Sequence, residues 1–281
     1  MSIAAALVGG TLNTTSLASR RLAGRGAFAL FSTPLRRGRL RPAELDQIAG
    51  ARTATMTVEG KSVRTYRWGS GERPILFVHG WWSRGSRVAP LVPGLLARGY
   101  SPISFDAPGH GESGGRSTTI MEYREIIRRL HAEYGDFEAI VAHSFGVAAS
   151  FYALRDEVRA GRLVGVSGVG EFGYLLEKFS GHLKLRDRVS GELRRLIEDG
   201  LFPGRPDIWR NFSATHRPEE FDLPILLIHD DGDSMVLPEQ SRRIAAAHGD
   251  RVRLIVTNGL GHNKILADPG VVDTVLHFLD S

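Results

Sequence analysis

The chain has 281 residues, which is enough for one large α/β domain or two small ones with a sizeable buried core. It contains no cysteine, which excludes disulfide bonds, thiolate metal sites and a cysteine nucleophile. The net charge of +5 belongs to the N-terminal segment: residues 1–43 carry seven of the 36 basic residues and no acidic one, so 29 basic and 31 acidic residues follow. We therefore expect no nucleic-acid binding by the rest of the chain.

Residues 1–52 differ in composition from everything that follows. The apolar start MSIAAALVGG has no basic residue ahead of it, which argues against a secretory signal, and no apolar run reaches the roughly 18 to 20 residues of a membrane span. Apolar side chains such as Leu22 and Phe28 interleave with arginines. This pattern fits a helical or partly disordered arm on the domain, a segment lying on an anionic membrane surface, or an organelle transit peptide. We expect a cytoplasmic protein, with membrane contact through this basic arm as one alternative.

From residue 53 onward, strand and helix patterns alternate. Residues 53–58 and 62–68 flank a turn and predict a hairpin. The continuous apolar run PILFVH (74–79) predicts a strand that is buried on both faces of a parallel sheet. The next strands are predicted over 101–106, 137–143 and 162–168, and helices over 87–98, 119–134 and 145–158.

The alternation stops over residues 171–221, which show amphipathic helical patterns and no clear strand. It resumes with strands over 224–229 and 251–256 and helices over 239–248 and 268–280. Strands that alternate with helices predict right-handed crossovers and a mostly parallel sheet, here of about eight strands. The interrupted region predicts a helical insertion after the sixth strand.

A serine stands where the fifth strand meets the next helix, in the stretch AHSFG (142–146). Ligands bind beyond the carboxyl ends of parallel strands, so Ser144 is at the functional edge of the sheet. A nucleophile elbow requires small residues two positions before and after the serine. Gly146 meets this requirement, and Ala142 replaces the more usual glycine. A serine at this join can also cap the helix, so the motif alone leaves both interpretations open.

The stretch VHGWW (78–82) ends the first parallel strand. Gly80 permits a sharp turn, after which the backbone N–H of Trp81 can point toward a developing oxyanion. The N–H of Phe145, directly after Ser144, is the second candidate donor. The alternative is a tight turn whose tryptophans fill the core. We interpret His79 as a structural hydrogen-bonding residue rather than a catalytic one.

Two further loops carry an acid and a base. HDDGDSMVLPEQ (229–240) holds three aspartates whose spacing does not fit a calcium-binding loop. We choose Asp233 as the group that orients a histidine, and interpret Asp230 and Asp231 as turn formers. His262, in the glycine-flanked stretch NGLGHNKIL, follows the last strand and is free to reach across the sheet edge as a general base.

Together VHGWW, FDAPGHGES (105–113), AHSFG, DGDSMV and GLGH resemble the serine esterase and lipase branch of the α/β-hydrolase fold superfamily, over roughly residues 53–281. The resemblance implies an eight-stranded, mostly parallel sheet flanked by helices, with a small helical cap at about 171–221. It implies Ser144 as nucleophile, Asp233 as acid and His262 as base, in the chain order of this family. FDAPGHGES corresponds to a shaping turn with a structural role.

The constellation predicts a serine hydrolase that cleaves a carboxylic ester, or a related acyl bond, through an acyl-enzyme. The substrate is expected to be small to medium in size and hydrophobic, and the chemistry requires no metal or organic cofactor. Trp82, Phe172 and Trp209 are candidate pocket residues, although aromatic residues of the cap at helical spacing can instead pack with one another. The serine argues against the family's epoxide hydrolases and haloalkane dehalogenases, which use an aspartate nucleophile.

Two alternatives remain beside the ester hydrolase. The same triad can transfer an acyl group to an alcohol or cleave a C–C bond, and the fold can serve as a non-catalytic binding protein. The sequence does not predict an oligomeric state.

Overall fold

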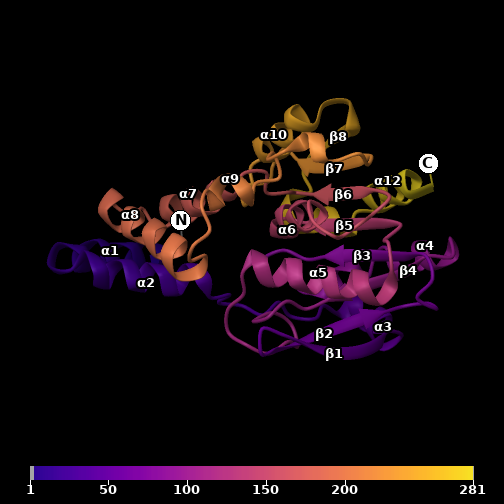
Figure 1. Cartoon of the computed structure of the whole chain (residues 1–281), viewed down its shortest axis with the longest axis horizontal. Helices are drawn as coiled ribbons and strands as arrows, with labels where there is room; N and C mark the ends of the chain where they lie inside the picture. Colours follow the sequence, from indigo (N-terminus) through magenta and orange to yellow (C-terminus); the bar gives the residue numbers. More distant parts are fainter. Residues whose placement is uncertain (1–2, 281) are drawn as a thin grey trace.

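The computed structural model describes residues 3–280 and is built around one sheet (Figure 1). Across these residues the sheet has eight strands in the order β1-β2-β4-β3-β5-β6-β7-β8. The strands are β1 (Arg52–Val58), β2 (Lys61–Arg67), β3 (Pro74–Val78), β4 (Ser101–Phe105), β5 (Ala139–His143), β6 (Leu163–Val166), β7 (Ile225–Asp230) and β8 (Val252–Thr257). The predicted eight-stranded, mostly parallel sheet is confirmed.

Within residues 3–280 the antiparallel pairings are β1 with β2 and β2 with β4. Glu59 and Gly60, which join β1 to β2, have φ angles of +47° and +73°, as a two-residue type I′ hairpin turn requires. From β3 to β8 every pairing is parallel. In this register Val78 pairs with Ala142, and Ala142 with Gly165, so β3, β5 and β6 end at one edge of the sheet.

Helices cover both faces of the sheet, which explains the continuous apolar runs. One face packs against α5 (Ile120–Tyr134), α6 (Phe145–Leu154) and α10 (Glu239–His248). The other face packs against α4 (Val92–Ala97) and α12 (Pro269–Asp280). Neighbouring residues of one strand therefore belong to different cores: Leu76 faces the first group of helices and Phe77 the second.

The helix predicted over 87–98 is shorter than expected. Gly85–Val88 is a 3-10 helix, and α4 begins only at Val92. Pro90 lies between the two, and a proline has no backbone N–H with which to continue a helix. Pro93 is tolerated because it stands in the first turn of α4.

Residues 171–221 lie beside the sheet and are mainly helical. They contain α7 (Phe172–His182), α8 (Asp187–Leu196), a π-helical turn at Ile197–Leu201 and the short α9 (Ile208–Asn211). The N-terminal segment contributes α1 (Ile3–Ala18) and α2 (Arg20–Ser32), and a small α3 (Leu45–Ala49) precedes β1. Figure 1 shows α1, α2, α7 and α8 together at one end of the molecule.

Close contacts hold the N-terminal helices against this region. A Cβ on Gly9 would lie 1.8 Å from the Leu183 carbonyl oxygen, and a Cβ on Gly24 would lie 2.3 Å from Cγ of Glu192. Both distances are impossible for a real side chain, so only glycine permits this packing. None of the helices within residues 3–280 combines the length and apolar character that crossing a bilayer requires.

Candidate active site

Ser144 occupies an unusual backbone conformation between β5 and α6. Its φ of +57° and ψ of −121° lie in a region that L-residues other than glycine rarely adopt. The turn is tight: a Cβ on Gly146 would lie 2.3 Å from the Val78 carbonyl oxygen, and one on Gly80 would lie 2.7 Å from Cβ of Ser144. The Ser144 hydroxyl makes no capping hydrogen bond to α6. The helix-cap interpretation of this serine is therefore not supported.

The structure brings together the three side chains predicted as nucleophile, acid and base. Ser144 Oγ lies 3.0 Å from Nε2 of His262, which is on the short helix α11 (Gly261–Lys264) after β8. His262 Nδ1 lies 2.7 Å from Oδ2 of Asp233, in the loop after β7. All three side chains are buried. The hydrogen bonds therefore connect groups that are 118 and 29 residues apart in the sequence.

The Asp233 carboxylate is held ionised by several donors. Its Oδ1 accepts hydrogen bonds from the backbone N–H groups of Met235 at 2.8 Å and Val236 at 3.0 Å. Burial alone would raise the pKa of Asp233, but hydrogen bonds from His229 and His262 outweigh it and keep the pKa well below its usual range. An ionised Asp233 fixes the proton of His262 on Nδ1 and leaves Nε2 to accept a hydrogen bond from the Ser144 hydroxyl.

A second buried histidine, which the sequence analysis did not single out, supports the acid. His229 is the next-to-last residue of β7, and its Nε2 lies 3.0 Å from the Val236 carbonyl oxygen and 3.4 Å from Oδ2 of Asp233. With Nε2 donating, its Nδ1 accepts a hydrogen bond of 2.6 Å from the Ser241 hydroxyl. The only signal in the sequence was a histidine at the end of the otherwise apolar run PILLIH.

His143 was also missed, although it directly precedes Ser144. Its Nε2 lies 2.9 Å from the His262 carbonyl oxygen, and the two imidazole rings are 4.7 Å apart. Burial, followed by the proximity of His262, lowers the pKa of His143 to about 3, so the ring is neutral. Its position at the end of the buried strand AIVAH was the available clue.

The two predicted oxyanion donors lie on chain segments that are far apart in sequence and pack against each other. The rings of Trp81 and Phe145 make an edge-on contact at 5.8 Å, and the preceding Gly80 approaches Ser144. His79 orients this loop: its Nδ1 donates to the Gly80 carbonyl at 2.7 Å, and its Nε2 accepts from the Ala107 N–H at 2.9 Å. Burial lowers the pKa of His79 to about 4, which suits a neutral structural residue.

The stretch FDAPGHGES forms a turn held by a buried carboxylate. Asp106 accepts hydrogen bonds from the Tyr66 hydroxyl at 2.9 Å and from the backbone N–H groups of Gly85 at 2.7 Å and Glu112 at 2.8 Å. Asp106 thus connects β2, the loop after β3 and this turn. The contacts are those of a structural residue.

The three candidate pocket residues lie in different surroundings. Trp82 is 45% exposed, and its backbone N–H donates to Nε2 of His110 at 3.2 Å. Phe172 is buried among other aromatic side chains, at ring distances of 5.8 Å from Trp209 and 5.1 Å from Phe212. Trp209 also donates to Glu198 at 2.5 Å. Phe172 and Trp209 thus pack largely within the helical segment, which is the alternative stated for its aromatic residues.

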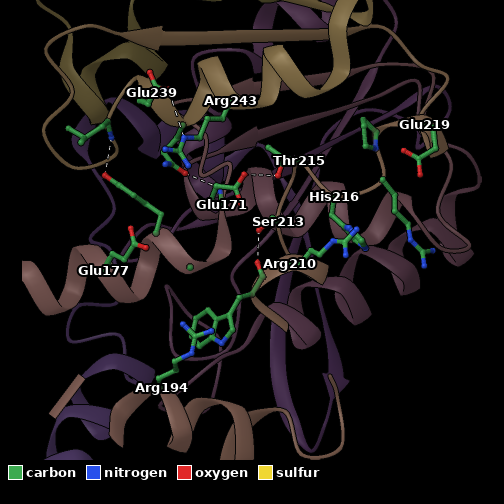
Figure 2. Close-up of a pocket in the computed structure, with 17 residues that line it drawn as sticks. Glu171, Glu177, Arg194, Arg210, Ser213, Thr215, His216, Glu219, Glu239 and Arg243 are labelled. Carbon is green, nitrogen blue, oxygen red and sulfur yellow. Dashed lines mark hydrogen bonds and ion pairs between the residues drawn. The ribbon is translucent and has the colours of Figure 1, made fainter. Parts of the chain in front are cut away.

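Trp209 lines a cavity of about 820 Å³, shown in Figure 2. Charged side chains converge on this cavity: Arg194 from α8, Glu177 from α7, and Glu239 and Arg243 from α10. Within the described chain, none of the triad residues lines it. Residues 3–280 also contain no group of three or more His, Asp or Glu side chains arranged to hold a metal ion.

Residues 75–274 match the model of the alpha/beta hydrolase family. The chain belongs to this family. The α/β hydrolase is similar to a non-heme haloperoxidase from Rhodococcus erythropolis, with 26% identity over 268 residues that cover 79% of this chain and 97% of the relative. The resemblance to the α/β-hydrolase superfamily inferred from the sequence motifs is thereby confirmed.

Two solved structures show the same fold as this α/β hydrolase. An esterase from Pyrococcus furiosus aligns with a TM-score of 0.64 and 20% identity, covering 89% of this chain and 97% of its own. A bromoperoxidase from Bacillus anthracis aligns with a TM-score of 0.63 and 19% identity, covering 82% of this chain and 100% of its own.

Proposed function

We propose that this α/β hydrolase is a serine hydrolase that cleaves a carboxylic ester, or a related acyl bond, of a small to medium hydrophobic substrate. The observation that carries the proposal is the hydrogen-bonded series from Ser144 through His262 to Asp233, with distances of 3.0 and 2.7 Å. A serine at a strained turn, free of helix capping and bonded to a histidine, is the arrangement that nucleophilic catalysis requires.

In the proposed reaction, Ser144 Oγ attacks the carbonyl carbon while His262 Nε2 takes the hydroxyl proton. Asp233 stays ionised and stabilises the imidazolium that forms. The backbone N–H groups of Trp81 and Phe145 are the proposed donors to the oxyanion of the tetrahedral intermediate. Collapse of the intermediate breaks the acyl–oxygen bond, and His262 protonates the leaving alcohol. His262 then removes a proton from water, which attacks the acyl-enzyme and releases the acid.

The residues around Ser144 support an apolar acyl group. Phe145 is buried, Trp81 is half-buried and Trp82 is partly exposed, so aromatic surface lies next to the nucleophile. Aromatic and aliphatic walls with few polar groups favour substrates that bury hydrophobic area. We therefore expect short p-nitrophenyl esters to be turned over and charged acyl groups to be poor substrates.

A fluorophosphonate probe and a short ester series test the proposal. The probe should label the wild-type protein at Ser144, and Ser144→Ala should lose both labelling and at least about 10⁴-fold in kcat/KM. Ser150→Ala, which changes a buried serine of α6 outside the triad, is the matched control and should still be labelled. A folded wild-type protein that the probe does not label would refute the proposal.

The names of the haloperoxidase relatives support a second candidate function, in which hydrogen peroxide replaces water as the acyl acceptor. Attack of peroxide on the acyl-enzyme would release a peroxy acid and restore the Ser144 hydroxyl, with His262 taking the proton. The supporting observation is the 26% identity to the Rhodococcus erythropolis haloperoxidase. Bromide oxidation that depends on acetate, peroxide and Ser144 would support this outcome. Product analysis with an added alcohol separates hydrolysis from acyl transfer.

A further inference from the structure

Helix α1 has an exposed apolar side that nothing in the described chain covers. Ile3, Leu7 and Leu17 are 82%, 67% and 62% exposed. Their spacing places them on one side of the helix, and we call these three residues the apolar stripe. Within residues 3–280 the five most exposed large apolar side chains all belong to the N-terminal segment: Ile3, Leu7, Leu35, Leu17 and Leu22. Such a concentration indicates a contact surface.

The other side of α1 is already held against the body of the protein. Gly9 packs directly on the Leu183 carbonyl oxygen. The Asn13 side chain donates to the Lys184 carbonyl at 2.9 Å and accepts from the Arg186 N–H at 2.8 Å. These contacts fix the orientation of α1. The apolar stripe therefore faces outward in the folded protein, rather than marking a helix that has not found its place.

The N-terminal segment that carries the apolar stripe is also basic. Helix α1 itself has no charged residue, whereas Arg21 and Arg25 on α2 and Arg36 just beyond it are exposed. No acidic residue occurs before Glu44. Leu17 and Arg21 are close in sequence on either side of the α1–α2 junction, so apolar and cationic groups meet at this corner. An apolar helix face in an arginine-rich, acid-free segment is complementary to an anionic lipid surface.

A second copy of the chain is less complementary to this surface. A symmetric dimer through the apolar stripe would place two copies of the arginine-rich, acid-free N-terminal segment against each other, and like charges disfavour such an interface. Helix α1 has 16 residues, about 24 Å at 1.5 Å per residue, which is shorter than the hydrocarbon core of a bilayer. Its geometry suits lying in the interface.

We propose that the α1–α2 hairpin docks the protein on the surface of an anionic bilayer. The apolar stripe enters the boundary between headgroups and acyl chains, and Arg21, Arg25 and Arg36 contact lipid phosphates. Because α2 packs on α8, docking places the helical segment after β6 next to the lipid. The inference does not depend on the proposed serine hydrolase activity.

Vesicle flotation of the full chain tests the proposal. The wild-type protein should float with phosphatidylcholine vesicles that contain phosphatidylglycerol, much less with phosphatidylcholine alone, and less as salt increases. Leu7→Glu combined with Leu17→Glu should lower binding at least about tenfold. Arg21→Gln, Arg25→Gln and Arg36→Gln together should lower it about fivefold per arginine.

Matched controls come from exposed residues outside the hairpin. Leu96→Glu on α4, and Arg52→Gln, Arg251→Gln and Arg253→Gln together, should bind vesicles as the wild type does. Ser144→Ala should also bind normally, which separates docking from catalysis. Near-UV circular dichroism establishes folding. If the double glutamate variant is unfolded, the arginine variant alone decides the matter.

Three results would overturn the proposal. They are absence of wild-type flotation with the anionic vesicles, equal binding to neutral vesicles, and vesicle binding that the hairpin variants leave unchanged. A dimer seen by light scattering, and dissociated by Leu7→Glu, would instead assign the apolar stripe to a second copy of the chain.

Discussion

His143 Nε2 donates a hydrogen bond of 2.9 Å to the carbonyl oxygen of His262, 119 residues further along the chain. The residue before the proposed nucleophile thereby holds the backbone of the proposed base. Both groups are buried, so loss of the donor would leave the carbonyl without a partner.

We expect His143→Phe to lower kcat about 10- to 100-fold with little change in KM, because His262 would lose its alignment with Ser144. His143→Gln, which keeps a side-chain N–H near the position of Nε2, should recover part of the lost kcat. Steady-state kinetics with a short p-nitrophenyl ester measures both. Equal kcat values for the two variants would show that the donor is unimportant and only the side-chain volume matters.

Replacing Asp233 with asparagine tests the choice among Asp230, Asp231 and Asp233, at the end of β7 and directly after it. Asparagine cannot stabilise an imidazolium and favours the wrong tautomer of His262, so kcat should fall by about 10⁴-fold. Asp231 is exposed and pairs with Arg242 at 3.0 Å, outside the triad. Asp231→Asn is therefore the matched control and should retain activity. Comparable losses in the two variants would contradict the assignment.

Three buried neutral histidines predict that the protein loses stability as the pH falls from neutral. Burial lowers the pKa values of His79 to about 4 and of His110 and His143 to about 3, below the value of about 6.5 in an unfolded chain. Between these values the unfolded state binds more protons, so stability falls as pH decreases below about 6.5.

Near pH 5, three such histidines should make the free energy of unfolding fall by about 4 kcal/mol for each pH unit of acidification. Urea unfolding at a series of pH values measures it. His110→Gln should reduce the slope by about one-third. A free energy of unfolding that stays constant between about pH 7 and 5 would be inconsistent with three neutral buried rings.

The elbow around Ser144 should tolerate no added atom at Gly146. A Cβ there would lie 2.3 Å from the Val78 carbonyl oxygen, so Gly146→Ala should destabilise the fold and displace Ser144. We expect a loss of at least about 2 kcal/mol in the free energy of unfolding, together with reduced turnover. Gly173→Ala on α7, where no atom lies within 4 Å of the added Cβ, is the control and should be neutral or stabilising.

The strands could be predicted from the sequence because both faces of the sheet are covered. PILFVH and PILLIH read as continuous apolar runs, and β3 and β7 begin within one residue of the positions expected from them. The proximity of Ser144, Asp233 and His262 followed from one topological rule, that parallel strands end at the same edge.

Other features depend on contacts that a local pattern does not encode. The roles of His143 and His229 come from hydrogen bonds between loops far apart in sequence, and apolar periodicity carries no information about such partners. Phe172 and Trp209 are aromatic residues at helical spacing, a pattern equally suited to a pocket wall and to packing within helices. Only the three-dimensional structure distinguishes these placements.

The contact between Gly9 and Leu183 also has a consequence during synthesis of the chain. The partner of α1 leaves the ribosome long after α1 itself, by about 10 to 35 s at typical elongation rates. Throughout that interval the side of α1 that finally packs on Leu183 lacks this partner, and the apolar stripe is exposed as well. Growing chains of this protein therefore offer chaperones a site on α1, and this site closes only when Leu183, at the end of α7, has been made.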